Sequence, residues 1–214
     1  MSAGCAFSSR ECEAELNLTE PVEERKVRSK TLKMVVTGEV NVGKSLLVDN
    51  IVSKKYRRPL PTYFPTLHVD FRIRKWDVDG ETYALQIWDI PANEKTESVA
   101  DGWFRGTDFM VFVYNVCERA TFERLVHHLE RYERMVPAKA QTVWILVGTH
   151  RDRVLITPEC EQVSETEAQN LAETLHALNL RISLIDEFNF DWHKKIQQQI
   201  AALFLSQFGI GLPG

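Results

Sequence analysis

The chain has 214 residues, of which 44% are hydrophobic and 26% charged, as is usual for a globular protein with one domain and a sizeable core. The net charge of −4 argues against a nucleic-acid-binding protein, which usually has an excess of basic residues. No apolar run approaches the roughly 18 residues needed to span a bilayer, and the N-terminus lacks the layout of a secretory signal.

The secondary structure is predicted from the apolar pattern in chain order. Residues 1–29 mix Ser, Glu, Lys and Arg with little periodicity, and we expect a flexible tail. Apolar runs and alternations predict strands over residues 32–36, 69–78, 83–88, 109–114, 143–147 and 180–184. Helical spacing predicts helices over residues 43–53, 121–135, 164–178 and 190–208.

Two local signals support this assignment. Asp79-Gly80 is a hairpin turn signal between two of the strands, and Ser164 followed by Glu167 resembles a capping box. Strand and helix alternate almost throughout, which predicts an α/β fold with a mostly parallel six-stranded sheet and helices on both faces. We expect one domain over residues 30–208, followed by a short tail over 209–214.

Neither the cysteines nor the histidines have a metal-binding pattern. The four cysteines are irregularly spaced, and we expect free thiols in a cytosolic protein: Cys5, Cys12, Cys117 and Cys160. His127 and His128 are adjacent on a predicted helix and so point in different directions, which favours a structural role over a metal site.

A phosphate-binding loop is the strongest motif in the chain. Gly38-Glu39-Val40-Asn41-Val42-Gly43-Lys44-Ser45 fits G-x-x-x-x-G-K-[ST], after a predicted buried strand and at the start of a helix. In such a loop backbone N–H groups point at phosphate oxygens, and the helix N-terminus adds partial positive charge. We expect Lys44 to reach the β- and γ-phosphates and Ser45 to ligate Mg²⁺. The predicted phosphate-binding residues are Gly38, Asn41, Val42, Gly43, Lys44, Ser45 and Leu46.

The base preference is predicted from the segment Val147-Gly148-Thr149-His150-Arg151-Asp152, which follows a buried strand. GTPases of the Ras superfamily carry N-K-x-D or T-K-x-D at this place. An aspartate there accepts hydrogen bonds from the ring N–H and the exocyclic amine of guanine. Adenine presents the wrong donors and would leave the carboxylate unpaired, so Asp152 predicts guanine.

From residue 31 to about residue 206 the chain resembles the Rab branch of the Ras superfamily. Residues 64–71 (FPTLHVDF) resemble the Rab switch I segment T-I-G-V-D-F, and residues 85–89 (LQIWD) match L-Q-I-W-D. Residues 103–106 (WFRG) resemble Y-Y-R-G, and residues 113–116 (VYNV) resemble V-Y-D-I. The spacing from Trp88 to Gly106 equals the Rab spacing without a gap, which secures the register.

The resemblance implies roles for residues outside the phosphate loop. Tyr56 takes the place of the aromatic residue that packs against the base. Thr66 takes the place of the switch I threonine that ligates Mg²⁺, and Asp89 would hold Mg²⁺ through a water. Thr149 has precedent in the Rho branch, whereas His150 replaces the lysine that covers the guanine face. The loop that contacts guanine O6 corresponds to Ser183, Leu184 and Ile185.

The same resemblance implies an effector surface. Phe71, Trp88 and Trp103 match the aromatic triad that Rab effectors contact. An ordinary hydrophobic cluster explains the three aromatic residues equally well, so both interpretations stay open.

Three departures from the Rab pattern fall on the hydrolysis reaction. Asn93 occupies the place of the glutamine that orients the attacking water, and its side chain is one methylene shorter. Ala92 replaces the glycine whose N–H meets the γ-phosphate, beside Pro91, which lacks a donor. Val40 adds a branched side chain where Ras has glycine. We expect nucleotide to be retained and hydrolysis to be impaired; the alternative is an activating protein that supplies the missing group.

Two further differences leave alternatives open. Between Ser45 and Thr66 lie about three more residues than in typical Rabs, which is either a partner-specific loop or a tolerated insertion. The chain lacks a C-terminal cysteine for prenylation and has Ser2 where myristoylation needs glycine. Either the protein acts without a lipid or its C-terminus has been trimmed, so membrane association stays open.

The prediction for function is a GTP-binding switch that uses GTP/GDP and Mg²⁺ and recruits effector proteins through switch I and switch II in membrane trafficking. An exchange factor and an activating protein are possible partners, and we expect a cytoplasmic protein, at most peripheral on an intracellular membrane. The alternative is a pseudo-GTPase scaffold that binds nucleotide weakly. A P-loop kinase is disfavoured, because Asp152 and the Rab-like strands would then be coincidence.

Overall fold

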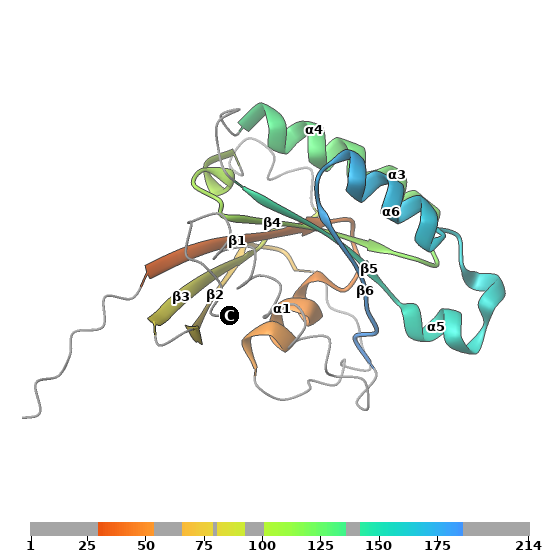
Figure 1. Cartoon of the computed structure of the whole chain (residues 1–214), viewed down its shortest axis with the longest axis horizontal. Coiled ribbons are helices and arrows are strands. Elements are labelled where there is room, and N and C mark those ends of the chain that lie inside the picture. The colour runs from red at the N-terminus through yellow and green to blue at the C-terminus, as the bar shows by residue number, and fades with distance from the viewer. Residues whose placement is uncertain (1–29, 54–65, 79–80, 93–100, 136–141, 186–214) are drawn as a thin grey trace, which may run out of the picture.

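A computed structural model describes residues 30–53, 66–78, 81–92, 101–135 and 142–185, and within them it shows one six-stranded sheet (Figure 1). The strand order is β2-β3-β1-β4-β5-β6. Only the β2–β3 pair is antiparallel, which confirms the predicted mostly parallel α/β fold. The strands are β1 (Lys30–Gly38), β2 (Asp70–Val78), β3 (Glu81–Asp89), β4 (Phe109–Asn115), β5 (Val143–Thr149) and β6 (Leu178–Arg181).

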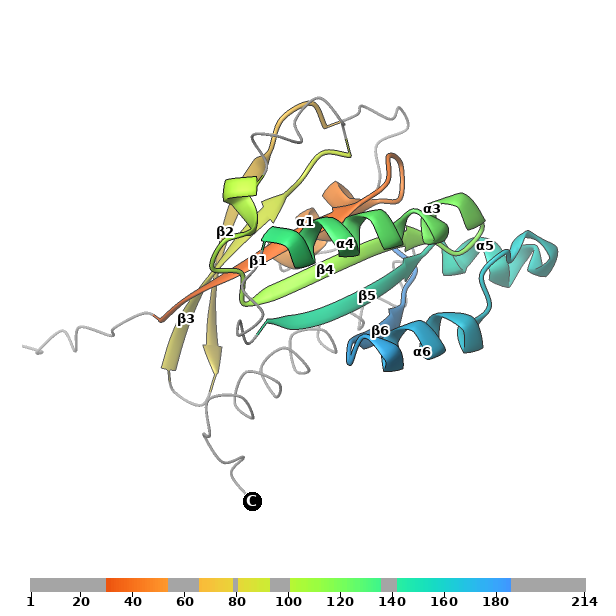
Figure 2. The same ribbon diagram turned by 90° about the horizontal axis from the view of Figure 1, so that it is seen from above.

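Helices cover both faces of the sheet, as Figures 1 and 2 show. α1 lies on one face, whereas α3, α4 and α6 lie on the other. None of the helices in the described ranges is long and apolar enough to cross a membrane. The helices are α1 (Lys44–Val52), α3 (Arg119–Glu123), α4 (Leu125–Met135), α5 (Arg151–Ile156) and α6 (Glu165–Thr174), with short 3-10 turns η2 (Asp101–Phe104) and η3 (Pro158–Cys160).

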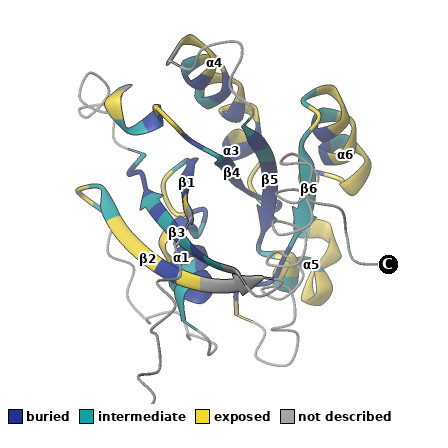
Figure 3. Cartoon of the chain, turned by 60° about the vertical axis from the view of Figure 1, so that its left-hand side comes forward, coloured by how far each residue is buried: buried dark blue, intermediate teal, exposed yellow. Residues whose placement is uncertain are grey.

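The core consists of two apolar clusters, one on each side of the sheet. Met34 and Val36 of β1 belong to the cluster under α1, whereas Val35 between them belongs to the cluster under α3, α4 and α6. Every residue of β4 is buried, and its sequence is apolar from Phe109 to Tyr114 without alternation, with only Asn115 at its end polar. Burial is deepest in the central strands, and β2 is the exposed edge strand (Figure 3).

The bounds of several predicted elements differ from the structure, among them the helix predicted over residues 164–178, which ends at Thr174 before β6 begins at Leu178. The helix predicted over residues 121–135 is divided at Arg124, because the N–H of His127 bonds to the Arg124 carbonyl three residues back and tightens the turn. The last strand begins earlier than predicted and ends at Arg181. Only the backbone N–H of Ile182 still bonds to β5, at 2.8 Å from the Gly148 carbonyl.

The sequence pattern missed α5 but predicted the capping box at α6. The Ser164 side chain accepts a hydrogen bond from the Glu167 N–H, as predicted. The Glu167 carboxylate accepts the reciprocal hydrogen bond from the Ser164 backbone, and it also forms an ion pair with Arg119. The tails, the Asp79-Gly80 turn and the predicted helix over 190–208 lie outside the described residues.

Candidate functional site

The phosphate loop joins β1 to α1 at the carboxyl end of the parallel strands, where ligands of open α/β sheets bind. Gly38 has φ 143°, and a Cβ added there would lie 2.2 Å from the Val113 carbonyl oxygen. Gly43 has φ 91°, and its Cβ would lie 2.8 Å from Leu184. Asn41, with φ 62°, is also left-handed. Both glycines of the motif are therefore required by the backbone of this loop.

Lys44 lies over the phosphate loop. Its ammonium donates hydrogen bonds to the carbonyl oxygens of Gly38 at 3.0 Å and Glu39 at 2.7 Å. Burial lowers the pKa of Lys44 to about 8, although the nearby carboxylates of Asp89 and Glu39 act in the opposite direction. A buried cation directed at the loop is suited to neutralise an anionic ligand.

Ser45, Thr66 and Asp89 come together beside Lys44. The Ser45 hydroxyl donates to Asp89 Oδ2 at 2.5 Å and lies 2.8 Å from the Thr66 hydroxyl. The strand register sets this arrangement, because Asp89 pairs with Val36 just before the phosphate loop. Burial raises the pKa of Asp89, while the Ser45 hydrogen bond lowers it.

This cluster fits a magnesium ion. Two hydroxyls and a carboxylate are oxygen donors of the kind Mg²⁺ prefers. Asp89 is buried, and its Oδ1 has no hydrogen-bond partner within the described part of the chain. Such an orphaned carboxylate oxygen is costly unless a cation or its water satisfies it.

The segments predicted to recognise the base meet at the far side of the phosphate loop. Thr149 is fully buried at the end of β5, and its hydroxyl lies 2.8 Å from the Val42 carbonyl and 3.0 Å from the Tyr114 carbonyl. The Asp152 Oδ1 atom accepts a hydrogen bond from the Ser183 hydroxyl at 3.0 Å. Leu184 contacts Gly43, so residues far apart in the sequence are brought to one place.

His150 has a left-handed backbone, with φ 64°, at the N-terminus of α5. Its Nδ1 lies 2.9 Å from the Thr149 hydroxyl. Burial lowers the pKa of His150, with Arg153 acting in the same direction and Asp152 in the opposite one. The neutral, half-buried imidazole ring of His150 is thus held beside Asp152. The resemblance implies that a side chain at this place covers one face of the guanine ring.

The remaining predicted site residues differ in exposure, and two of them lie outside the described residues. Val40 is exposed on the phosphate loop, Ala92 is half-buried after the buried Pro91, and Ile185 is exposed. Leu46 packs against the core under α1. Tyr56 and Asn93 lie outside the described residues.

The sequence reasoning missed the contacts of the phosphate loop with Arg124, which lies between α3 and α4, and with His128 of α4. The Glu39 carboxylate lies 3.0 Å from the Arg124 guanidinium and 3.5 Å from His128 Nε2. Arg124 and Glu39 are 85 residues apart, and no local pattern connects them.

Two residues of the predicted effector triad lie side by side. The rings of Phe71 on β2 and Trp88 on β3 have centroids 4.8 Å apart. Phe71 is exposed, whereas Trp88 and Trp103 are half-buried and pack against the cluster under α4. The exposed edge of β2 also presents Ile73, so an apolar surface surrounds Phe71.

The fold and the phosphate loop define a P-loop nucleotide-binding protein of the small GTPase type. The model of the Ras family matches residues 33–201. The chain belongs to the Ras family and is a Rab-like small GTPase of the Ras superfamily. Proteins of this family generally bind GTP or GDP with Mg²⁺.

Three relatives illustrate the similarity. The Ras and EF-hand domain-containing protein homolog of Caenorhabditis elegans is 32% identical over 166 residues, which make up 76% of this chain and 24% of that protein. Ras-related protein RABD1 of Arabidopsis thaliana is 30% identical over 159 residues, 74% of this chain and 73% of the relative. Ras-related protein SEC4 of Saccharomyces cerevisiae is 27% identical over 188 residues, 86% of this chain and 83% of the relative. The chain thus spans about a quarter of the first relative.

Proposed function

We propose that this protein is a guanine-nucleotide switch that binds GTP with Mg²⁺ and hydrolyses GTP poorly. The observation that carries the proposal is the cluster of Ser45, Thr66 and Asp89 beside the buried ammonium of Lys44. Together these residues supply oxygen ligands for a cation and a positive charge for phosphates.

The base is held, in this proposal, by residues from two segments, one after β5 and one after β6. Asp152 accepts the guanine N–H groups, His150 covers one face of the ring, and Ser183 orients the Asp152 carboxylate through its hydrogen bond. A ligand without those N–H donors leaves the carboxylate unpaired, so guanine is preferred over adenine.

The impairment lies at the positions that complete the hydrolysis site. Val40 places a branched side chain at the phosphate loop, and Ala92 follows a buried proline that cannot donate a hydrogen bond. With the shorter Asn93, a displacement of about 1 Å from the attacking geometry reduces the rate on the order of 100-fold. We expect the intrinsic rate to lie at least about ten-fold below the roughly 10⁻⁴ s⁻¹ of Ras.

Effector recruitment is proposed for the exposed edge of β2. Phe71 and Ile73 are exposed apolar side chains of β2, and this strand follows Thr66, whose hydroxyl belongs to the magnesium cluster. In this proposal a change at the nucleotide reaches the surface through the short segment between Thr66 and Phe71. From the Rab relationship we propose a role in membrane trafficking. The protein is expected in the cytoplasm and peripherally on intracellular membranes. An exchange factor and an activating protein are proposed as further partners.

A pseudo-GTPase scaffold is the second candidate, and one observation favours it. His150 stands where the family has lysine, and its ring is already hydrogen-bonded to Thr149. In this alternative the fold presents its effector surface without cycling between nucleotides.

The nucleotide content of the purified full chain tests the proposal. The protein is denatured, and the released nucleotide is separated by anion-exchange chromatography. Near-stoichiometric GTP supports the slow switch, whereas mostly GDP would contradict impaired hydrolysis. Failure to contain or take up any guanine nucleotide would favour the scaffold.

A matched variant tests the cause of the slow rate. The triple variant Val40→Gly/Ala92→Gly/Asn93→Gln introduces the Ras residue at these three positions and keeps Pro91, and we expect its single-turnover rate to rise at least about ten-fold. Lys44→Ala serves as the control that loses binding. An unchanged rate in the triple variant would show that these three positions do not limit hydrolysis.

A further inference from the structure

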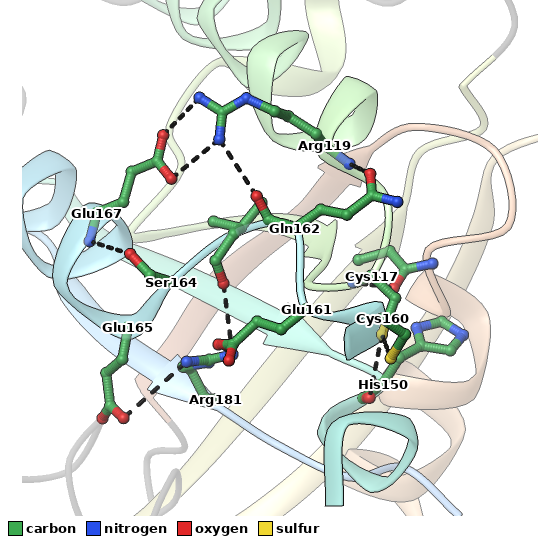
Figure 4. A network of polar contacts seen from close by, with 12 residues as sticks. Cys117, Arg119, His150, Cys160, Glu161, Gln162, Ser164, Glu165, Glu167 and Arg181 are labelled. Carbon is green, nitrogen blue, oxygen red and sulfur yellow. Dashed lines mark hydrogen bonds and ion pairs between the residues drawn. The ribbon is translucent and has the colours of Figure 1, made fainter. Parts of the chain in front are cut away.

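Two cysteines that the nucleotide site does not use lie in contact. The Sγ atoms of Cys117, after β4, and Cys160, in η3, are 2.8 Å apart (Figure 4). Both are free thiols and both are half-buried. A movement of less than about 1 Å would bring the two sulfurs to the disulfide bond length of about 2.05 Å.

The backbone around the two cysteines is held in place from several sides. The N–H groups of Gln162 and Val163 donate to the Val116 carbonyl at 2.9 and 3.1 Å, directly beside the cysteine pair. The Arg119 N–H donates to Gln162 Oε1 at 2.9 Å, and Arg119 also forms an ion pair with Glu167 (Figure 4). The segment that carries Cys160 is therefore fixed against the segment that carries Cys117.

A third contact fixes the same segment from the sheet. The Arg181 guanidinium on β6 lies 2.5 Å from the Glu161 carboxylate, next to Cys160 in the chain. Because both backbones are anchored, the two thiols do not depend on a rare fluctuation to meet. In the described ranges no group of three or more His, Cys, Asp or Glu side chains could hold a metal ion.

We propose that Cys117 and Cys160 are a dithiol site that a hydroperoxide oxidises to a reversible intramolecular disulfide. In the first step one thiol attacks the O–O bond of the peroxide, which leaves a sulfenic acid and releases an alcohol or water. In the second step the other sulfur attacks the sulfenic acid, the S–S bond forms, and the hydroxyl leaves with the thiol proton as water. The peroxide takes up the two electrons that the two thiols lose.

The environment distinguishes the two thiols. Burial, followed by the contact with Cys160, raises the pKa of Cys117 to about 12. Cys117 thus keeps its proton at neutral pH and attacks a free peroxide slowly. The first oxidation is therefore assigned to Cys160. Cys117, held 2.8 Å from that sulfur, then attacks the sulfenic acid and gives its thiol proton to the departing hydroxyl.

The disulfide joins segments on either side of the predicted base-binding residues. It closes a loop that contains β5, His150 and Asp152. The Cys117 sulfur also lies 4.0 Å from the His150 carbonyl oxygen, at the start of α5. A cross-link here restrains the segment that holds the base, and we expect slower nucleotide release from the oxidised form. This consequence rests on the proposed function, whereas the cross-link does not.

The cross-link is tested in the full chain carrying Cys5→Ser and Cys12→Ser, which leaves only the two thiols of interest. The protein is treated with hydrogen peroxide, remaining thiols are alkylated, and the protein is digested with trypsin without reductant. We expect residues 106–119 to be linked to residues 154–181, and dithiothreitol to release the link. Alkylated or separately overoxidised cysteines without the linked pair would overturn the proposal.

A second measurement does not depend on peptide mapping. Closing a loop of roughly 40 residues constrains the unfolded chain and is expected to raise the Tm on the order of 10 °C. The further variants Cys117→Ser and Cys160→Ser should show no such peroxide-dependent rise. A rise of the same size in either variant would contradict the assignment to this pair.

Nucleotide release separates the two proposals. Peroxide-treated protein loaded with a fluorescent guanine nucleotide should release it more slowly than the reduced form. The release rate of Cys160→Ser should be the same before and after peroxide treatment. A chain that forms the cross-link but takes up no nucleotide would overturn the proposed switch and leave the disulfide site supported. A chain that binds nucleotide but forms no cross-link would overturn the disulfide site and leave the nucleotide switch supported.

Discussion

At Gly38 the backbone leaves β1 with φ 143°, and an added Cβ would lie 2.2 Å from the carbonyl oxygen of Val113 in the neighbouring strand. Neither atom can move aside, because the Val113 carbonyl belongs to β4 in the centre of the sheet. We expect Gly38→Ala to lower the free energy of unfolding by about 3 kcal/mol or more, from left-handed strain and the backbone clash. In a chain of this size the Tm should fall by about 6–12 °C, measured by thermal denaturation without added nucleotide.

The matched control is Gly102→Ala in η2. A Cβ at Gly102 would meet nothing within 4 Å, so we expect a change of less than about 0.5 kcal/mol. Equal Tm values for the two variants would show that the close approach at Gly38 is not a constraint on this fold.

The residues of the site divide into those that a motif predicts and those that only the fold brings together. Gly38, Lys44 and Ser45 are within one short segment, so their spacing alone indicated phosphate binding. The contact between Glu39 and Arg124 joins residues 85 positions apart, and neither residue is unusual in its local sequence. Only the packing of the junction between α3 and α4, where Arg124 lies, against the phosphate loop produces it.

At the level of elements, the apolar pattern predicted each strand, because the buried strands β1, β4 and β5 are apolar runs and the outer strands β2 and β3 alternate. It could not predict the break at Arg124, since the residues on both sides continue one helical pattern. It also missed α5, which has only 6 residues and no buried side chain, so no apolar face marks it.

The packing of α4 against the phosphate loop predicts a pH dependence of stability. His128 lies on α4 with its Nε2 3.5 Å from Glu39 and its Nδ1 3.4 Å from the Thr37 hydroxyl. Burial lowers the pKa of His128; Lys44 and Arg131 act in the same direction, and Glu39 opposes them. Below the unfolded value of about 6.5 the unfolded chain takes up the proton first, so stability falls as pH falls through this value.

The measurement is urea denaturation of the wild type, His128→Gln and His127→Gln between pH 7 and pH 5. We expect the loss of stability on acidification to be smaller in His128→Gln, because the buried titrating group is gone. His127 is exposed on the same helix, so His127→Gln should keep the wild-type slope. A steeper loss of stability on acidification in His128→Gln would mean that the effect of Glu39 on the pKa of His128 is larger than the effect of burial.

Across the whole molecule, the site depends on the order of the strands. β1 and β4 are neighbours, and so are β4 and β5, so the ends of all three strands meet at one edge. The register places Asn115 beside Thr149 and Gly38 beside Val113. Single strands can be predicted from sequence, whereas this alignment of their ends follows from hydrogen bonds between segments more than 30 residues apart.

Thr149 shows most directly how the phosphate and base sides are joined. Its buried hydroxyl lies within hydrogen-bonding distance of two carbonyl oxygens, Val42 in the phosphate loop and Tyr114 in β4. Thr149→Val keeps the branched shape but removes the donor and leaves buried carbonyl groups with one partner fewer. We expect a loss of about 1–3 kcal/mol in the free energy of unfolding and faster release of bound guanine nucleotide. Thr157→Val, an exposed threonine at the end of α5, should change neither quantity. If Thr149→Val lowered stability and left the release rate unchanged, the hydroxyl would be a core contact only, and the phosphate loop would hold its shape without it.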